Sequence, residues 1–270
     1  LLNDPTRPST ANCTEKYFTQ RLDHFNFAPD PSITNETTYQ QRYFVCNEDK
    51  WMPNQPIFFY TGNECNVELF VNMTGLMWEN ALPFPGEEMP PPPRINYLTT
   101  DQALADYATL ISGLKGDSPN SAVVGFGGSY GGMLCSWLRV KYPMALDGCI
   151  AGSAPIANFE FMSPPFNFDS FAQTETFDAS KAGGASDVCE DNIRKSWQDM
   201  ITLGQTQSGR DTISKAFKTC KPLQSYAEVW DFINYASNSF GNMAMSSYPY
   251  PSAYLLLGGK GILPAYPMRL

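Results

Sequence analysis

The feature that most constrains the fold of this chain is a glycine-rich turn, Gly-Gly-Ser-Tyr-Gly, at residues 127–131. It follows a short apolar run, Ala122–Phe126, and precedes a segment with helical spacing of apolar residues that ends at Pro143. We therefore predict a buried strand that turns sharply into a helix. Side chains two residues before and two after the centre of such a turn would collide, and Gly127 and Gly131 avoid this.

This strand, turn and helix make Ser129 a candidate nucleophile, because Gly-x-Ser-x-Gly in that context is typical of hydrolases. The free amides of the first helical turn face the reacting carbonyl, so the Tyr130 amide is the expected first oxyanion donor. A phosphate-binding turn is disfavoured, since the Walker lysine and the Rossmann glycine spacing are missing. A second donor should come from the loop after an earlier apolar strand, although an ordinary turn explains its spacing equally well; this loop contains Thr61, Gly62, Asn63 and Glu64.

A serine nucleophile needs a base beside it, normally a histidine that a carboxylate orients. In hydrolases with this turn both partners follow the serine along the chain. The sequence contains one histidine, His24, which precedes Ser129. We therefore interpret His24 as structural, and spacing singles out no triad carboxylate after Ser129.

Seven cysteines and three glycosylation sequons indicate an exported protein. The cysteines form no C-x-x-C motif and have one histidine for company, so disulfides are expected in place of a zinc site. Their odd number leaves one thiol free or pairs it with a residue beyond Leu270, and we favour the second explanation. No metal or other cofactor is expected. The sequons begin in polar segments at Asn12, Asn35 and Asn72.

Charge and hydropathy exclude two classes of partner. The chain has 27 acidic and 18 basic residues, a formal net charge of −9, so it would repel a nucleic-acid backbone. No apolar run approaches the roughly twenty residues that a membrane-spanning helix needs, so no membrane partner is expected.

Strand and helix patterns follow one another along the chain. The expected strands are Lys16–Leu22, Gln41–Cys46, Pro56–Tyr60, Ala122–Phe126 and Leu146–Ala151. Besides the helix after the turn, helices are expected at Val67–Ala81, between Thr99 and Gly116, and at Val188–Leu203, Thr212–Phe217 and Tyr226–Asn238, with a proline-rich loop at Leu82–Pro93. The pattern beyond Phe159 is helical and irregular, which predicts two domains, residues 1–158 and 159–270.

A series of segments resembles one family of serine peptidases, which comprises lysosomal Pro-X carboxypeptidase, dipeptidyl peptidase II and thymus-specific serine protease. The wording of the first and third of these segments is nearer to dipeptidyl peptidase II. In chain order the segments are Phe18–Phe27, Gln41–Phe44, Pro56–Glu64, Leu98–Tyr107, Gly127–Leu134, Lys141–Pro143, Ala151–Ile156 and Met243–Pro251.

The resemblance implies an α/β-hydrolase core with an inserted helical cap domain, and cleavage of short peptides after proline or a small residue. Ser129 matches the family's nucleophile, and Gly62, Asn63 and Glu64 match its oxyanion-side loop, with Glu64 on the substrate side. A lysosomal, vesicular or secreted location is implied, with a peptide substrate as partner, and the full-length form could be a homodimer.

Two departures from the family stand out. A core strand with the motif Glu-His-Arg-Tyr-Tyr-Gly should lie between Ala81 and Leu82 and is missing, which predicts an incomplete sheet. The family chain also continues further and supplies the triad Asp and His, so residues 159–270 would be an incomplete cap. The chain is therefore expected to be inactive alone. A non-catalytic fragment or pseudoenzyme, a Pro-X carboxypeptidase-like enzyme and a carboxylesterase are the alternatives.

Overall fold

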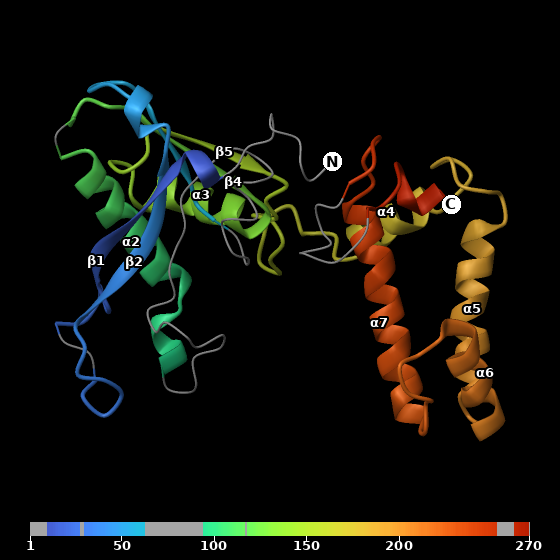
Figure 1. Ribbon diagram of the computed structural model, residues 1–270. Coiled ribbons are helices and arrows are strands. Elements are labelled where there is room, and N and C mark those ends of the chain that lie inside the picture. The colour runs from blue at the N-terminus through green and yellow to red at the C-terminus, as the bar shows by residue number, and fades with distance from the viewer. Residues whose placement is uncertain (1–9, 28–29, 63–93, 117, 253–261, 270) are drawn as a thin grey trace. The chain divides into compact units, whose positions relative to one another are not determined.

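The computed structural model describes residues 10–27, 30–62, 94–116, 118–252 and 262–269 (Figure 1). These residues form a mixed α/β fold with a small parallel sheet, and the chain divides into two compact units, 1–159 and 160–270. The predicted helix at Val67–Ala81 and the proline-rich loop after it lie outside the described residues.

The first unit begins with an antiparallel hairpin of β1 (Cys13–Arg21) and β2 (Thr38–Cys46). Both strands begin three residues before the expected start. The register pairs Cys13 with Cys46, and these two residues form a disulfide at the open end of the hairpin. The short 3₁₀ turns η1 (Thr10–Asn12) and η2 (Glu48–Lys50) flank it.

A parallel three-stranded sheet carries the glycine-rich turn. It consists of β3 (Ile57–Tyr60), β4 (Val123–Gly128) and β5 (Gly148–Gly152), in the order β3-β4-β5. Phe59, Gly125 and Cys149 lie in one row across the sheet and therefore share a face. Because the strands are parallel, their carboxyl ends meet at one edge, where Gly62 and Ser129 follow β3 and β4.

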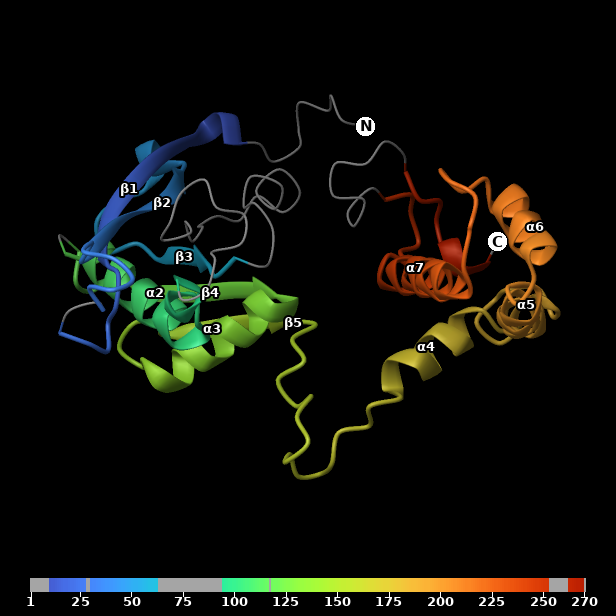
Figure 2. The ribbon, with the colours of Figure 1, turned by 90° about the horizontal axis from the view of Figure 1, so that it is seen from below.

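Two helices cover the face that contains this row (Figure 2). Helix α2 (Thr100–Leu114) packs on β3, where the Tyr107 and Phe59 rings meet edge to face at 5.5 Å. Helix α3 (Ser129–Lys141) packs on β4 and β5, and a Cβ at Gly125 would lie 2.7 Å from Cys135 Sγ. Glycine at position 125 therefore allows α3 to approach the sheet closely.

The start of α2 confirms part of the expected capping pattern. Thr99 is the N-cap, and its side chain accepts a hydrogen bond from the Gln102 amide. The Gln102 side chain does not complete a capping box, because it donates to Asp23 Oδ1 at 2.7 Å and accepts from the His24 amide at 2.9 Å. It thus attaches the segment after β1 to α2. The turn η3 (Arg94–Tyr97) precedes the helix.

A buried carboxylate on α2 continues this polar network. Asp106 accepts hydrogen bonds from His24 Nε2 at 2.8 Å and from the Tyr39 hydroxyl at 2.6 Å. Gln20 donates to the Asp106 carbonyl at 2.7 Å, so both strands of the hairpin are attached to the same turn of α2. Burial raises the pKa of the Asp106 carboxyl, while the bonds from His24 and Tyr39 act in the opposite direction.

This raised pKa predicts that Asp106 stabilises the folded chain more in acid than at neutral pH. In the unfolded chain this carboxyl has an ordinary pKa of ~3.9. Above that pH the unfolded state loses the proton before the folded state does, so the free energy of unfolding falls as pH rises. Unfolding free energies from urea titrations should therefore fall less steeply with rising pH in Asp106→Asn than in the unsubstituted chain. Asp30→Asn is the control, because Ser32 lowers the pKa of the exposed Asp30 carboxyl and gives the opposite sign. Equal slopes for Asp106→Asn and the unsubstituted chain would contradict the prediction.

The second unit is helical in the residues that the structure describes. It contains α4 (Ser170–Asp178), α5 (Cys189–Leu203), α6 (Gln207–Phe217), α7 (Tyr226–Met245) and the turn η5 (Pro267–Arg269). A capping box of Ser225 and Glu228 starts α7. The last three helices enclose a buried cluster of Met200, Ile213, Leu223, Val229 and Ile233.

Three helices of this unit differ from expectation. Helix α6 begins five residues before the predicted Thr212, because Gly209 allows close packing: a Cβ there would lie 1.9 Å from the Leu203 carbonyl oxygen. Helix α7 continues beyond Asn238, where the Phe240 ring contacts Trp197 of α5. Helix α4 was not predicted and buries none of its side chains. Across the described residues, every helix is too short or too polar to cross a bilayer.

Candidate active site

The predicted strand-to-helix turn is present, with Ser129 at its tip. Strand β4 ends at Gly128, and Ser129 is the first residue of α3. Its backbone has φ +52°, a left-handed conformation that costs a non-glycine residue about 1–2 kcal/mol. Ser129 is exposed, whereas Gly127 and Gly131 on either side are buried. The packed turn thus holds a strained serine toward solvent, as in a nucleophile elbow.

Close packing explains two glycines at this turn, Gly127 and Gly132. A Cβ at Gly127 would lie 2.2 Å from the Gly131 carbonyl oxygen and 2.6 Å from Thr61 Oγ1. Gly132 is not among the predicted site residues, and a Cβ there would lie 2.8 Å from the Ala154 Cβ. The sequence signal for Gly132 is the Gly-Gly pair directly after Tyr130, of which it is the second residue. The missing side chain lets α3 approach the segment that follows β5.

Tyr130, whose backbone amide would be the first oxyanion donor, is held in place by its side chain. Its hydroxyl lies 2.8 Å from Thr100 Oγ1 at the start of α2, and its ring meets Trp137 edge to face at 6.5 Å. The side chain is therefore occupied in packing, and the backbone amide is the group available for chemistry in the first turn of α3. We retain the Tyr130 amide as a predicted donor.

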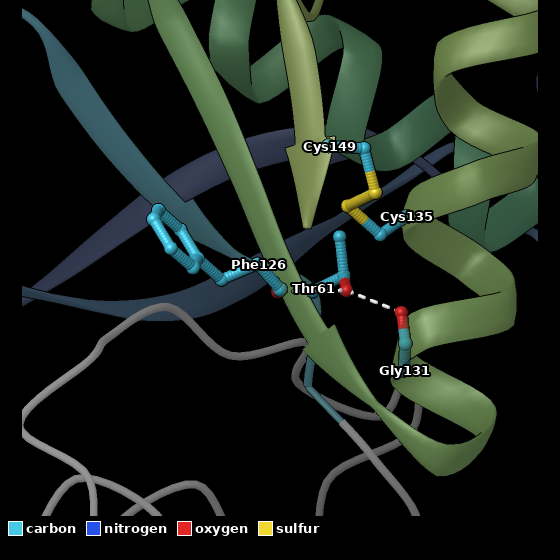
Figure 3. The surroundings of a disulfide bond; sticks show 5 residues. All are labelled: Thr61, Phe126, Gly131, Cys135 and Cys149. Atoms are coloured by element: carbon cyan, nitrogen blue, oxygen red, sulfur yellow. Dashed lines mark hydrogen bonds between the residues drawn. A yellow bond between two sulfur atoms is a disulfide. The ribbon is translucent and has the colours of Figure 1, made fainter. Parts of the chain in front are cut away.

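The loop after β3 lies beside the turn, as Figure 3 shows. Thr61 is fully buried, its amide donates to the Phe126 carbonyl at 3.0 Å, and its hydroxyl donates to the Gly131 carbonyl at 2.6 Å. Gly62 follows with φ +67°, a conformation that favours glycine. From the sequence, Thr61 is predicted only as a member of this loop. Asn63 and Glu64, the other predicted members of the site, lie outside the described residues.

A disulfide between Cys135 and Cys149 joins α3 to β5 near the turn (Figure 3). Together with the Cys13–Cys46 bond it confirms that the chain forms disulfides. In the part of the chain that the structure describes, Cys189 and Cys220 form no disulfide, and Cys65 is outside that part. Among the described cysteines, the two available for further pairing therefore both lie in the helical unit.

We expect mass spectrometry of protein secreted from eukaryotic cells to detect these bonds and N-linked glycans. Peptides containing Cys13 and Cys46, and those containing Cys135 and Cys149, should remain linked without reductant. Asn12 and Asn35 are exposed and should carry glycans, and Asn72, outside the described residues, is the third expected site. Seven free thiols together with unmodified sequons would contradict the inferred compartment.

The structure places His24 in the polar network of α2. Its Nε2 bonds to Asp106, and its ring lines a cavity of about 450 Å³ with Phe25, Ala105 and Tyr142, among others. Ser129 is not one of the residues that line this cavity. Among the described residues the Ser129 hydroxyl has no hydrogen-bond partner. The hydrogen bonds of His24 attach the hairpin to α2, and a structural role for His24 stays a prediction.

Comparison with known proteins supports one family. The model of serine carboxypeptidase S28 matches residues 20–257. Lysosomal Pro-X carboxypeptidase of Homo sapiens is 36% identical over 296 residues, which cover 100% of this chain and 56% of the relative. The Bos taurus protein of the same name is 35% identical, with coverages of 98% and 54%. Prolyl carboxy peptidase like protein 5 of Caenorhabditis elegans is 33% identical, with coverages of 100% and 56%.

These matches cover almost all of this chain but only part of each relative. The chain spans about half the length of the curated relatives it matches. The match to the human protein extends over 296 residues, more than the 270 of this chain, so the relative has residues without a counterpart here. The family model nevertheless covers most of the chain, including the turn that carries Ser129. The chain belongs to the serine carboxypeptidase S28 family of peptidases.

Proposed function

We propose that this chain is the nucleophile-bearing part of a serine exopeptidase that cleaves short peptides after proline or a small residue. The observation that carries the proposal is the exposed Ser129 at φ +52° between β4 and α3. A residue in this conformation costs stability, and such strain persists mainly where function requires it. Membership of a peptidase family identifies acyl transfer from a peptide as the chemistry.

In the proposed mechanism Ser129 Oγ attacks the carbonyl carbon of the scissile bond. The amide of Tyr130 and that of Gly62 or Asn63 donate hydrogen bonds to the oxyanion that forms. Glu64, which follows Asn63 in the sequence, is proposed to bind the substrate. A histidine that follows Ser129 in the family order would remove the serine proton, and an aspartate would orient that histidine. The first unit would then be the N-terminal part of an α/β-hydrolase domain, and the helical unit part of its cap.

Location follows from the same evidence. Two disulfides require an oxidising compartment, and two of the three sequons lie at exposed residues. The relatives from Homo sapiens and Bos taurus carry the word lysosomal in their names. We therefore propose a lysosomal, vesicular or secreted peptidase.

The end of the peptide that is attacked separates two forms of the proposal. The sequence motifs favour a dipeptidyl peptidase II-like enzyme, which would need a free N-terminus and release an X-Pro dipeptide. The names of the relatives favour a carboxypeptidase, which would need a free C-terminus and release the residue after proline. Matched peptides decide between them, one with a blocked N-terminus and one with a blocked C-terminus.

The deciding experiment starts from the transcript past Leu270. An Asp and a His in family context would support the exopeptidase, and a stop codon would favour a non-catalytic fragment. The longest encoded chain should hydrolyse one of the two matched peptides, and Ser129→Ala should abolish the activity. Turnover of simple esters without turnover of either peptide would instead identify a carboxylesterase, because the serine turn alone does not distinguish esters from amides.

A further inference from the structure

Thr61 connects the two segments that would supply the oxyanion donors. It is the residue between the end of β3 and Gly62, and it is 0% exposed. Its backbone amide continues the pairing of β3 with β4 by donating to the Phe126 carbonyl at 3.0 Å. Its carbonyl accepts a hydrogen bond from the Tyr107 hydroxyl of α2. Both backbone groups of Thr61 are therefore fixed by hydrogen bonds.

The Thr61 hydroxyl makes a third connection, which backbone pairing does not require. It lies 2.6 Å from the Gly131 carbonyl oxygen and 3.2 Å from that of Phe126. A hydroxyl has one proton to donate, and the shorter contact identifies Gly131 as its acceptor. Gly131 is two residues after Ser129, in the first turn of α3. The bond thus runs from the loop after β3 to the helix that carries the nucleophile (Figure 3).

This connection determines how the turn packs. Thr61 Oγ1 occupies space beside Gly127, where an added Cβ would lie 2.6 Å from it. A side chain at position 127 would therefore collide with the Thr61 hydroxyl. Valine has the shape of threonine, but its methyl group could not donate to the Gly131 carbonyl, and in the place of Oγ1 it would lie only 2.6 Å from that oxygen, closer than carbon and oxygen atoms pack. The hydroxyl, and not the shape of the side chain, makes the bond between loop and helix.

We propose that Thr61 is a positioning residue, whose hydroxyl sets the separation between the Tyr130 amide and the Gly62 amide. The inference rests on the function proposed above for Ser129. Oxyanion donors act on charge that develops in the transition state, so their misplacement lowers kcat and leaves ground-state binding unchanged. Thr61 acts on these donors through the backbone and does not contact the substrate.

The kinetic test uses the longest encoded chain and the peptide that it hydrolyses. Thr61→Val should lower kcat about 10- to 100-fold with KM changed less than about twofold, which is the expected size for misplaced groups. Thr61→Ser keeps the hydroxyl and should restore most of the rate. Thr109→Val is the matched control, since it removes a hydroxyl bond to the Ala105 carbonyl on an exposed part of α2. Equal losses in the valine and serine variants, or a loss confined to KM, would overturn the proposal.

Amide hydrogen exchange on the 270-residue chain tests the connection without any turnover. In Thr61→Val the amide of residue 61 should exchange about five- to tenfold faster, whereas amides of β1 and β2 should keep their rates. Unchanged exchange at residue 61 would overturn the proposal. If Thr61→Val fails to fold, Tyr107→Phe removes the other side-chain bond to Thr61 and should give the same kcat loss with unchanged KM. If the longest encoded chain shows no turnover that depends on Ser129, the proposed function is wrong. Amide hydrogen exchange would still test whether the Thr61 hydroxyl connects the loop to α3.

Discussion

Replacement of Gly127 by alanine is expected to cost the folded chain at least about 3 kcal/mol of unfolding free energy. The added Cβ would lie 2.2 Å from the Gly131 carbonyl oxygen, a backbone atom that can move only if the first turn of α3 moves. The clash also displaces the Thr61 hydroxyl, which lies 2.6 Å from the same point. Urea unfolding followed by circular dichroism measures the effect.

Gly148→Ala is the matched control for this prediction. Gly148 is also a strand glycine of the parallel sheet, but nothing lies within 4 Å of a Cβ built there. We expect its unfolding free energy to stay within about 1 kcal/mol of the unsubstituted chain. Similar losses at both positions would show that strand glycine itself, and not the crowded turn, determines the cost.

The 270-residue chain expressed alone is expected to give no detectable turnover of X-Pro dipeptide amides. Its one histidine precedes Ser129, and the ring bonds to the buried Asp106, so the serine has no base in the family order. Loss of the base in a serine peptidase lowers kcat by roughly 10⁶-fold, and the oxyanion donors and substrate binding alone leave a small residual rate.

The measurement is release of a fluorescent amine, compared with the Ser129→Ala variant. Equal background in both chains is the expected result. Turnover that Ser129→Ala abolishes would contradict the prediction and would mean that His24 or another group acts as base. His24→Gln would then separate these two explanations, since it removes the imidazole.

The turn was predictable because local sequence specifies it. Five consecutive residues, a preceding apolar run and a following amphipathic segment were enough to place Ser129 between a strand and a helix. The strand extends to Gly128, two residues beyond the predicted end at Phe126. This extension depends on the pairing of Gly127 and Gly128 with β5, a partner that local sequence does not reveal.

Contacts between distant segments were not predictable. Thr61 and Gly131 are 70 residues apart in sequence, and nothing in either segment indicates that a hydroxyl of one meets a carbonyl of the other. The same holds for Gln102, whose spacing from Thr99 indicated a capping box but whose side chain bonds to Asp23. The family resemblance, carried by segments along most of the chain, is confirmed by the match over residues 20–257.

The Cys135–Cys149 bond also indicates when, during biosynthesis, this site can be completed. Cytosolic thiols are kept reduced, so a newly made chain would reach the oxidising compartment before this link between α3 and β5 could form. This bond would therefore fix the helix that carries Ser129 only after export. In the proposed peptidase, the completed Ser129 turn would then form only outside the cytosol, away from cytosolic peptides.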